Sequence, residues 1–73
     1  MYVSEALRKM MTRHSLRQSD VAEKAGFKNQ SNVGMILKSG STMKLENLIR
    51  LADAMDCDIV IKDRDTSEEL VID

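Results

Sequence analysis

The sequence predicts a mainly helical fold in which four short helices are followed by a short C-terminal β-hairpin. Apolar residues recur at helical spacing in four segments, and short polar or glycine-containing links separate these segments. Two later runs are rich in β-branched residues and flank a polar turn. With 73 residues and no proline, the chain is expected to form one small unit.

The first two helices are predicted over residues 3–14 and 18–25. An apolar stripe marks the first of them and consists of Val3, Ala6, Leu7, Met10 and Met11. The second ends at Gly26, because glycine readily adopts the left-handed conformation that a helix C-terminus requires. Arg17 and Gln18 lie at the start of this second helix, beside backbone N–H groups that favour a phosphate.

A third helix is predicted from Gln30 to Leu37 or Lys38, with Asn29 as a cap that accepts a backbone N–H. Its buried face is formed by Val33, Ile36 and Leu37. The other face begins with neutral side chains that donate and accept hydrogen bonds, as the reading of base edges in a major groove requires. These side chains are Gln30, Ser31 and Asn32. A helix, a glycine turn and a second helix with a polar tip predict a helix-turn-helix.

The fourth helix is predicted over residues 44–55. Its apolar stripe consists of Leu45, Leu48, Ile49, Ala52 and Met55. The loop before it, residues 38–42, contains Gly40 and three hydroxyl side chains. Such a loop can hold a phosphate oxygen, but it is equally compatible with an ordinary helix connection.

The hairpin is predicted from strands at residues 57–61 and 69–72. Apolar residues lie on both strand faces and are Ile59, Val60, Ile61, Leu70, Val71 and Ile72. A lone hairpin is marginal in water, and its edges carry unpaired backbone groups. Residues 57–73 are therefore predicted to be the dimerisation element of a homodimer, and residues 1–56 its DNA-binding domain. The alternative is a hairpin packed on its own helices, with dimers formed only on DNA.

Charge is divided unevenly along the chain, although the net charge is −1. Residues 1–50 hold nine Lys/Arg and four Asp/Glu, a net of +5, whereas residues 51–73 hold two and eight, a net of −6. This polarity predicts that phosphate binds at one end only. The alternative is two independently solvated surfaces.

Several classes of protein are disfavoured. Cys57 is the single cysteine, so no internal disulfide is possible, and with no signal peptide the expected location is the cytoplasm. The apolar runs are too short to span a membrane. His14 and Cys57 lie in different elements and no metal-ligand spacing exists, so no enzyme, metal or cofactor is expected.

Residues 5–56 resemble the Cro/repressor-like helix-turn-helix proteins, often called the XRE family. The residues that carry the resemblance are Leu16–Gly26, Gln30–Val33 and Leu45–Met55. They extend over three helices, so the pattern is more specific than a single short motif. The resemblance implies a repressor-like helical DNA-binding domain that is usually dimeric on a two-fold symmetric operator.

The resemblance also implies roles for individual side chains. Those expected to face bases are Gln30, Ser31 and Met35, with Asn32 beside them. Those expected to contact phosphates are Arg17, Gln18, Lys28, Asn29, Lys38, Thr42 and Lys44. The partner is therefore expected to be double-stranded DNA.

The sequence departs from the family pattern in five places. The turn between Gly26 and Val33 holds six residues, one more than the common form. Arg17 replaces the usual hydroxyl or Asn cap of the second helix. Gly34 lies inside the third helix, where glycine costs roughly 1 kcal/mol against alanine. Met35 replaces a polar reader and can contact only a thymine methyl or no part of a base. Met11 and Leu37 occupy positions where many relatives have a buried Arg–Glu pair, so an apolar contact is expected there.

The function predicted from these residues is that of a sequence-specific DNA-binding transcriptional regulator, a repressor. Lys and Arg side chains would supply affinity through phosphates, and the polar tip of the third helix would supply specificity. The alternative is the antitoxin of a toxin–antitoxin pair, which binds a toxin protein through its acidic tail and also binds its own operator.

Overall fold

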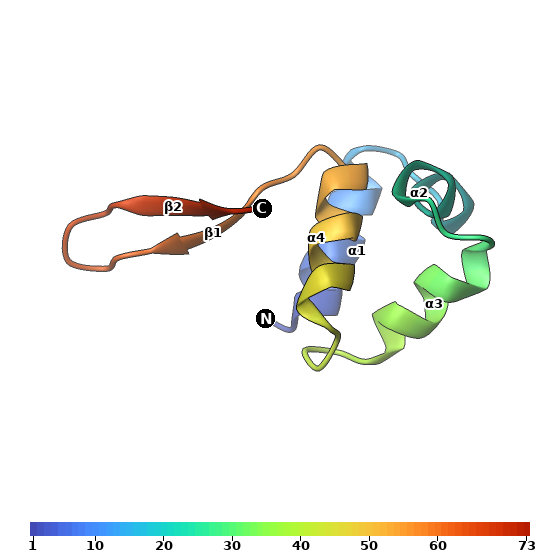
Figure 1. Cartoon of the computed structure of the whole chain (residues 1–73), viewed down its shortest axis with the longest axis horizontal. Helices are drawn as coiled ribbons and strands as arrows, with labels where there is room; N and C mark the ends of the chain where they lie inside the picture. The colour runs from blue at the N-terminus through green and yellow to red at the C-terminus, as the bar shows by residue number, and fades with distance from the viewer.

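The computed structural model describes residues 1–73 and has the mainly helical architecture predicted from the sequence (Figure 1). Its helices are α1 (Val3–Arg13), α2 (Gln18–Ala25), α3 (Gln30–Lys38) and α4 (Leu45–Ala54). They are followed by the strands β1 (Ile59–Lys62) and β2 (Glu69–Ile72), which pair antiparallel. The helices form one body, and the hairpin projects from it along the longest axis (Figure 1).

Most element ends follow local backbone signals. Gly26 adopts the predicted left-handed conformation, with φ of 79°, and ends α2. His14 is the C-cap of α1 rather than its last residue. The first strand starts later than expected, at Ile59, because the backbone N–H of Cys57 still donates to the carbonyl oxygen of Ala52 at 2.9 Å. Cys57 therefore closes the turn that follows α4 and is not part of β1.

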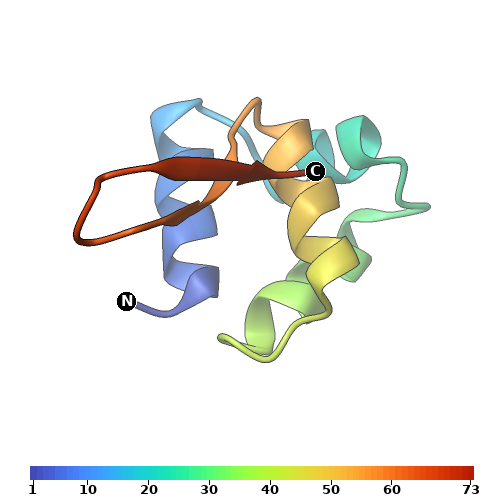
Figure 2. The same ribbon diagram turned by 60° about the vertical axis from the view of Figure 1, so that its left-hand side comes forward.

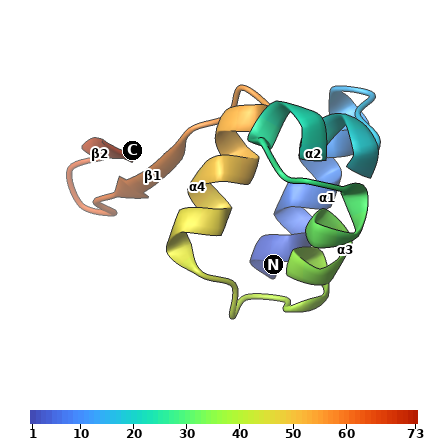
Figure 3. The same ribbon diagram turned by 45° about the vertical axis from the view of Figure 1, so that its right-hand side comes forward.

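One apolar cluster joins the four helices. Its buried members are Leu7, Met11, Val21, Ala22, Val33, Leu37, Leu51 and Met55. The helix α2 packs on α3 and α4, and α1 packs on α3. Figure 3 shows that α2 and α3 lie on the side of the body opposite the hairpin. Met11 and Leu37 are both buried in this cluster, and the direct contact between them stays a prediction.

The loop between α3 and α4 holds the start of α1. The backbone N–H of Ser4 donates to the carbonyl oxygen of Gly40 at 3.1 Å, and that of Val3 donates to Oγ of Ser41 at 3.1 Å. These two bonds satisfy N–H groups that have no partner inside a helix. The loop is therefore fixed against α1.

The hairpin has two different faces. Its register pairs Ile59 with Ile72, Val60 with Val71, Ile61 with Leu70 and Lys62 with Glu69. Directly paired residues of an antiparallel ladder point to the same side. One face is therefore wholly apolar and consists of Ile59, Ile61, Leu70 and Ile72. The sheet contains no third strand, so both outer edges are unpaired.

The turn of the hairpin is ordered by Asp63. Its side-chain oxygen accepts the backbone N–H groups of Asp65 at 2.8 Å and Thr66 at 3.4 Å. Figure 2 shows the turn extending past α1 and away from the body.

Among the helices, none combines the length and the apolar character that crossing a membrane requires.

Candidate nucleic-acid interface

The turn between α2 and α3 is held by a side chain from α4. Nη2 of Arg50 donates to the carbonyl oxygen of Ala25 at 2.9 Å, and Cζ of Arg50 lies 4.0 Å from the centroid of the Phe27 ring. A cation at a helix C-terminus and a cation over an aromatic ring are both stabilising arrangements. Arg50 therefore fixes the turn that leads into α3.

The exposed face of α3 carries the residues predicted to read bases. Gln30 and Ser31 are exposed at its start, and Asn32 is half-buried. Met35, one turn on, is 70% exposed. Lys38 continues this face, because positions 31, 35 and 38 are separated by four and three residues and lie along one side of a helix. The structure thus places a polar start and a cationic end on one surface of α3.

Asn29 occupies the N-cap position of α3 but does not cap it through its side chain. Its side-chain oxygen accepts the hydroxyl hydrogen of Ser31, while its backbone carbonyl accepts the N–H of Asn32 at 3.3 Å. The predicted side-chain cap is therefore wrong, because Ser31 takes the oxygen that would have served it. The NH2 group of Asn29 keeps its hydrogens for another partner.

Gln18 reaches from α2 to α3. It is half-buried, and a methyl group on Gly34 would lie 3.1 Å from its Oε1. An approach that short would displace the amide. Gly34 therefore leaves room for Gln18 at the joint between the two helices, a contact that the sequence did not indicate.

Asp20 stabilises the start of α2. Its carboxylate accepts the backbone N–H of Arg17 at 2.9 Å and lies 3.4 Å from Nε of Arg17. The backbone hydrogen bond is the main cause that lowers the pKa of the Asp20 carboxyl, and the guanidinium lowers the pKa further. The Arg17 side chain remains 83% exposed, so it is accessible to a phosphate. A carboxylate three residues later thus satisfies the backbone N–H of the N-cap residue, which is one half of a capping box.

The other residues predicted to contact phosphates lie in the turn before α3, at the end of α3 and in the loop before α4. Lys28 in the turn, Lys38 at the end of α3 and Lys44 before α4 are all exposed. Thr42 is exposed as well, but its hydroxyl donates to the carbonyl oxygen of Ser39 at 2.7 Å. The threonine oxygen can accept a hydrogen bond, whereas a phosphate requires a donor. The three lysines are therefore the stronger candidates.

One further polar residue beside α3 was not selected from the sequence. Asn47 of α4 is half-buried and lines a shallow hollow together with Asn32 and Met35. It stands three residues after Lys44 and so shares a side of α4 with that lysine. That spacing is the signal that could have identified it.

The residues predicted for dimerisation lie at the opposite end of the molecule from α3 (Figure 1). Ile59 and Ile72 are half-buried, and the exposed ones are Val60, Ile61, Leu70 and Val71. The acidic turn is therefore remote from the face of α3. No group of three or more His, Cys, Asp or Glu side chains is arranged to hold a metal ion.

A family model described as helix-turn-helix matches residues 7–61. The match contains the whole of α2, α3 and α4, and therefore all the side chains that form the exposed face of α3. Comparison with curated proteins and comparison with solved structures each give no match.

Proposed function

The chain belongs to the Cro/repressor-like (XRE) helix-turn-helix family of DNA-binding transcription regulators, and we propose that it is a repressor that binds a two-fold symmetric operator as a homodimer. The DNA would be double-stranded, and the protein would act in the cytoplasm, where its operator lies. No catalytic step is part of this function.

The observation that carries the proposal is the composition of the exposed face of α3. Gln30 can bond N6 and N7 of an adenine together, and Ser31 and Asn32 offer further donors and acceptors. Met35 would contact a thymine methyl. Around them, phosphate contacts would come from Arg17, Gln18, Lys28, Asn29, Lys38 and Lys44, with Asn47 added beside α3; Thr42, predicted from the sequence, is left out because its hydroxyl hydrogen is donated to Ser39.

The hairpin supports the dimer. Its apolar residues remain exposed on both faces, and both its edges are unpaired. Exposed strand edges and apolar surface favour association with another chain. In a two-fold dimer the same surfaces of both copies would meet, as an operator with two equivalent half-sites requires.

Selection of bound DNA from a random pool, repeated at several salt concentrations, tests the proposal. We expect an enriched site with two inverted half-sites whose centres are about 34 Å apart. The logarithm of the binding constant should fall linearly with the logarithm of the salt concentration, because phosphate contacts release counterions. A pool without any enriched sequence would contradict sequence-specific binding.

A second candidate function is that of an antitoxin. The observation that favours it is the projecting hairpin. Its turn is acidic and its strands are apolar, and both features would suit contact with a basic toxin. Coexpression with the adjacent reading frame tests it. A stable complex that relieves growth inhibition by that frame would support this function, and a frame without any toxicity would contradict it.

A further inference from the structure

We propose that the groove between α1 and α4 is the docking site for the hairpin of a second copy of this chain, so that two protomers exchange hairpins. The inference rests on the dimer proposed above. It goes further, because it assigns to each hairpin a receiving surface on the partner's helices.

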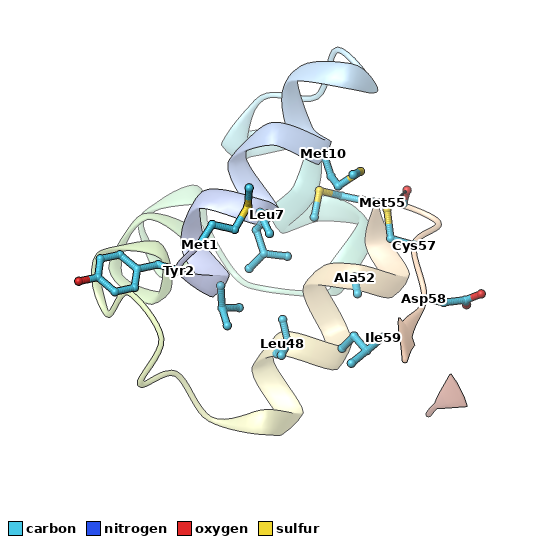
Figure 4. A pocket seen from close by; sticks show the side chains of 12 residues that line it. Met1, Tyr2, Leu7, Met10, Leu48, Ala52, Met55, Cys57, Asp58 and Ile59 are labelled. Carbon is cyan, nitrogen blue, oxygen red and sulfur yellow. Dashed lines mark hydrogen bonds between the residues drawn. The ribbon is translucent and has the colours of Figure 1, made fainter. Parts of the chain in front are cut away.

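The groove is an open hollow of about 390 Å³ with an almost entirely apolar lining. Ala6 and Met10 line it from α1, and Leu48 and Ala52 line it from α4. Ile59, at the start of β1, lies at one end, and Figure 4 shows it beside Ala52 and Leu48. The apolar surface of the groove is therefore continuous with the apolar face of the hairpin.

The hairpin exposes apolar side chains that its own body does not cover. Ile61 and Leu70 are paired on the same face as Ile59 and are 63% and 58% exposed. The strand β1 leaves the rim of its own groove at Ile59 and leads away from the body (Figure 1). Ile61 and Leu70 therefore cannot enter the groove of their own chain, whereas the groove of a second copy is open to them.

Charge favours the same occupant. Lys9 and Arg13 each follow a groove-lining residue of α1 by three positions, so both border the groove. Neither forms an ion pair within the chain, where the pair of Arg17 with Asp20 is the single one. The turn next to Ile61 and Leu70 is acidic, and its carboxylates are Asp63, Asp65 and Glu68. A docked hairpin would carry these carboxylates to the cationic edge of α1.

The spacing on DNA also favours an exchange of hairpins. The chain is 41 Å long, and α3 lies at the end opposite the hairpin (Figure 1). Hairpins that paired only with each other would leave the two bodies at opposite ends of the dimer, with the α3 helices farther apart than the about 34 Å between successive major grooves on one DNA face. A hairpin seated on the partner's body brings the two bodies together.

A charge exchange in the full chain tests the docking. One variant carries Lys9→Glu and Arg13→Glu, and a second carries Asp65→Lys and Glu68→Lys. Each homodimer then has like charges in contact, and we expect its dissociation constant in sedimentation to rise roughly tenfold or more. In an equal mixture both contacts are complementary, so we expect a heterodimer close to the wild type in affinity. Arg8→Glu, on the other flank of α1, is the matched control and should leave the dimer unchanged.

Each alternative outcome is decisive. A first variant that dimerises as tightly as the wild type would overturn the docking and leave hairpin pairing as the contact. A mixture no tighter than its components would overturn the docking as well. A wild type that remains monomeric at high micromolar concentration would overturn the dimer as the resting state in solution, and the docking with it, while the selection of a DNA site would still test the proposed function. Circular dichroism and thermal melting of every variant verify the fold.

Alkylation of Cys57 by iodoacetamide measures the groove directly. Cys57 lines the groove and is half-buried, so its reaction should slow when a hairpin fills the groove. We expect slower reaction above the dissociation constant of the wild-type dimer, and no slowing over the same range in the variant with Lys9→Glu and Arg13→Glu. A fast rate at every concentration in a chain that dimerises would overturn the docking alone. A rate that is slow at every concentration in the wild type and equally slow in the variant with Lys9→Glu and Arg13→Glu would also overturn the docking.

Discussion

Gly34 of α3 leaves the space that the amide of Gln18 from α2 occupies. A methyl group on Gly34 would lie 3.1 Å from Oε1 and 3.9 Å from Cδ of Gln18. Glycine inside a helix costs about 1 kcal/mol relative to alanine. The residue that leaves space for Gln18 therefore lowers the stability of α3. The pair joins the start of α2, where a phosphate contact is proposed, to the middle of α3, where bases would be read.

We expect Gly34→Ala to raise stability and to lower DNA affinity. Alanine removes the glycine penalty of about 1 kcal/mol, so the melting temperature should increase. The added methyl group would push Gln18 away by a few tenths of an ångström and disturb the phosphate contact proposed for it. Thermal melting and fluorescence anisotropy with the selected operator measure the two effects separately.

The matched control for this prediction is Gly34→Ala in a Gln18→Ala background. There is then no amide to displace, so the change should raise stability without a further loss of affinity. An equal loss of affinity in both backgrounds would contradict the role of Gln18. It would show that the methyl group obstructs the DNA itself.

Gln30 and Lys44 should differ in what they contribute to DNA binding. Gln30→Ala should weaken binding to the selected site by roughly 1–3 kcal/mol and relax preference at one base pair. Lys44→Ala should weaken binding to all sequences alike and reduce the dependence of affinity on salt. Competition binding with variants of the selected site makes the comparison. Unchanged affinity and preference after Gln30→Ala would place the reading face elsewhere.

The helices were predictable because their signals are local. The stop at Gly26 and the buried stripe through Val33 and Leu37 each involve neighbouring positions of one element. Such patterns also identified the start of α3 at Gln30. The side chain of Asn29 was misassigned for a related reason. Its oxygen could accept either a backbone N–H of α3 or the hydroxyl of Ser31, and it accepts the hydroxyl.

The contacts that organise the site were not predictable, because they join residues far apart in the chain. Arg50 and Ala25 are separated by 25 positions, and Val3 and Ser41 by 38. Hydrophobic periodicity describes one helix at a time and carries no information on which polar side chain crosses to another helix. The space beside Gly34 is of the same kind, because it depends on how α2 packs on α3.

Arg50→Ala should destabilise the turn between α2 and α3. It removes the hydrogen bond to Ala25 and the contact with the Phe27 ring, so we expect the free energy of unfolding to fall by roughly 1–2 kcal/mol in urea denaturation. Arg50→Lys keeps the charge without the planar fork and should recover only part of the loss. Full recovery by lysine would show that charge alone matters.

The lowered pKa of Asp20 predicts a dependence of stability on pH. The folded-state pKa lies below the ordinary value of 3.8, so the stabilising contribution is fully present above that value and is lost as the pH falls through the folded-state pKa. An NMR titration of the Asp20 carboxyl should therefore have its midpoint below 3.8. Arg17→Ala should keep most of this lowering, because the backbone N–H of residue 17 is its main cause. A midpoint at the ordinary value in the wild type would contradict the hydrogen bond.

Leu37→Glu should unfold much of the protein unless a cation is supplied at Met11. Leu37 is 2% and Met11 is 8% exposed, and both belong to the core. An unpaired buried carboxylate costs roughly 3–5 kcal/mol, which is comparable to the whole stability of a small domain. Adding Met11→Arg should recover part of that loss in a thermal melt, because it restores the ion pair that the family resemblance implies at these positions.

The control for this rescue is Met10→Arg in the Leu37→Glu background. Met10 is the neighbour of Met11 in sequence but lines the groove on α1, so its side chain points to a different part of the surface. A guanidinium there should not reach the carboxylate at position 37. Rescue by Met11→Arg alone would establish that residues 11 and 37 face each other across the interface of α1 and α3. Equal melting temperatures for both double variants would contradict that direct contact, since any nearby positive charge would then suffice.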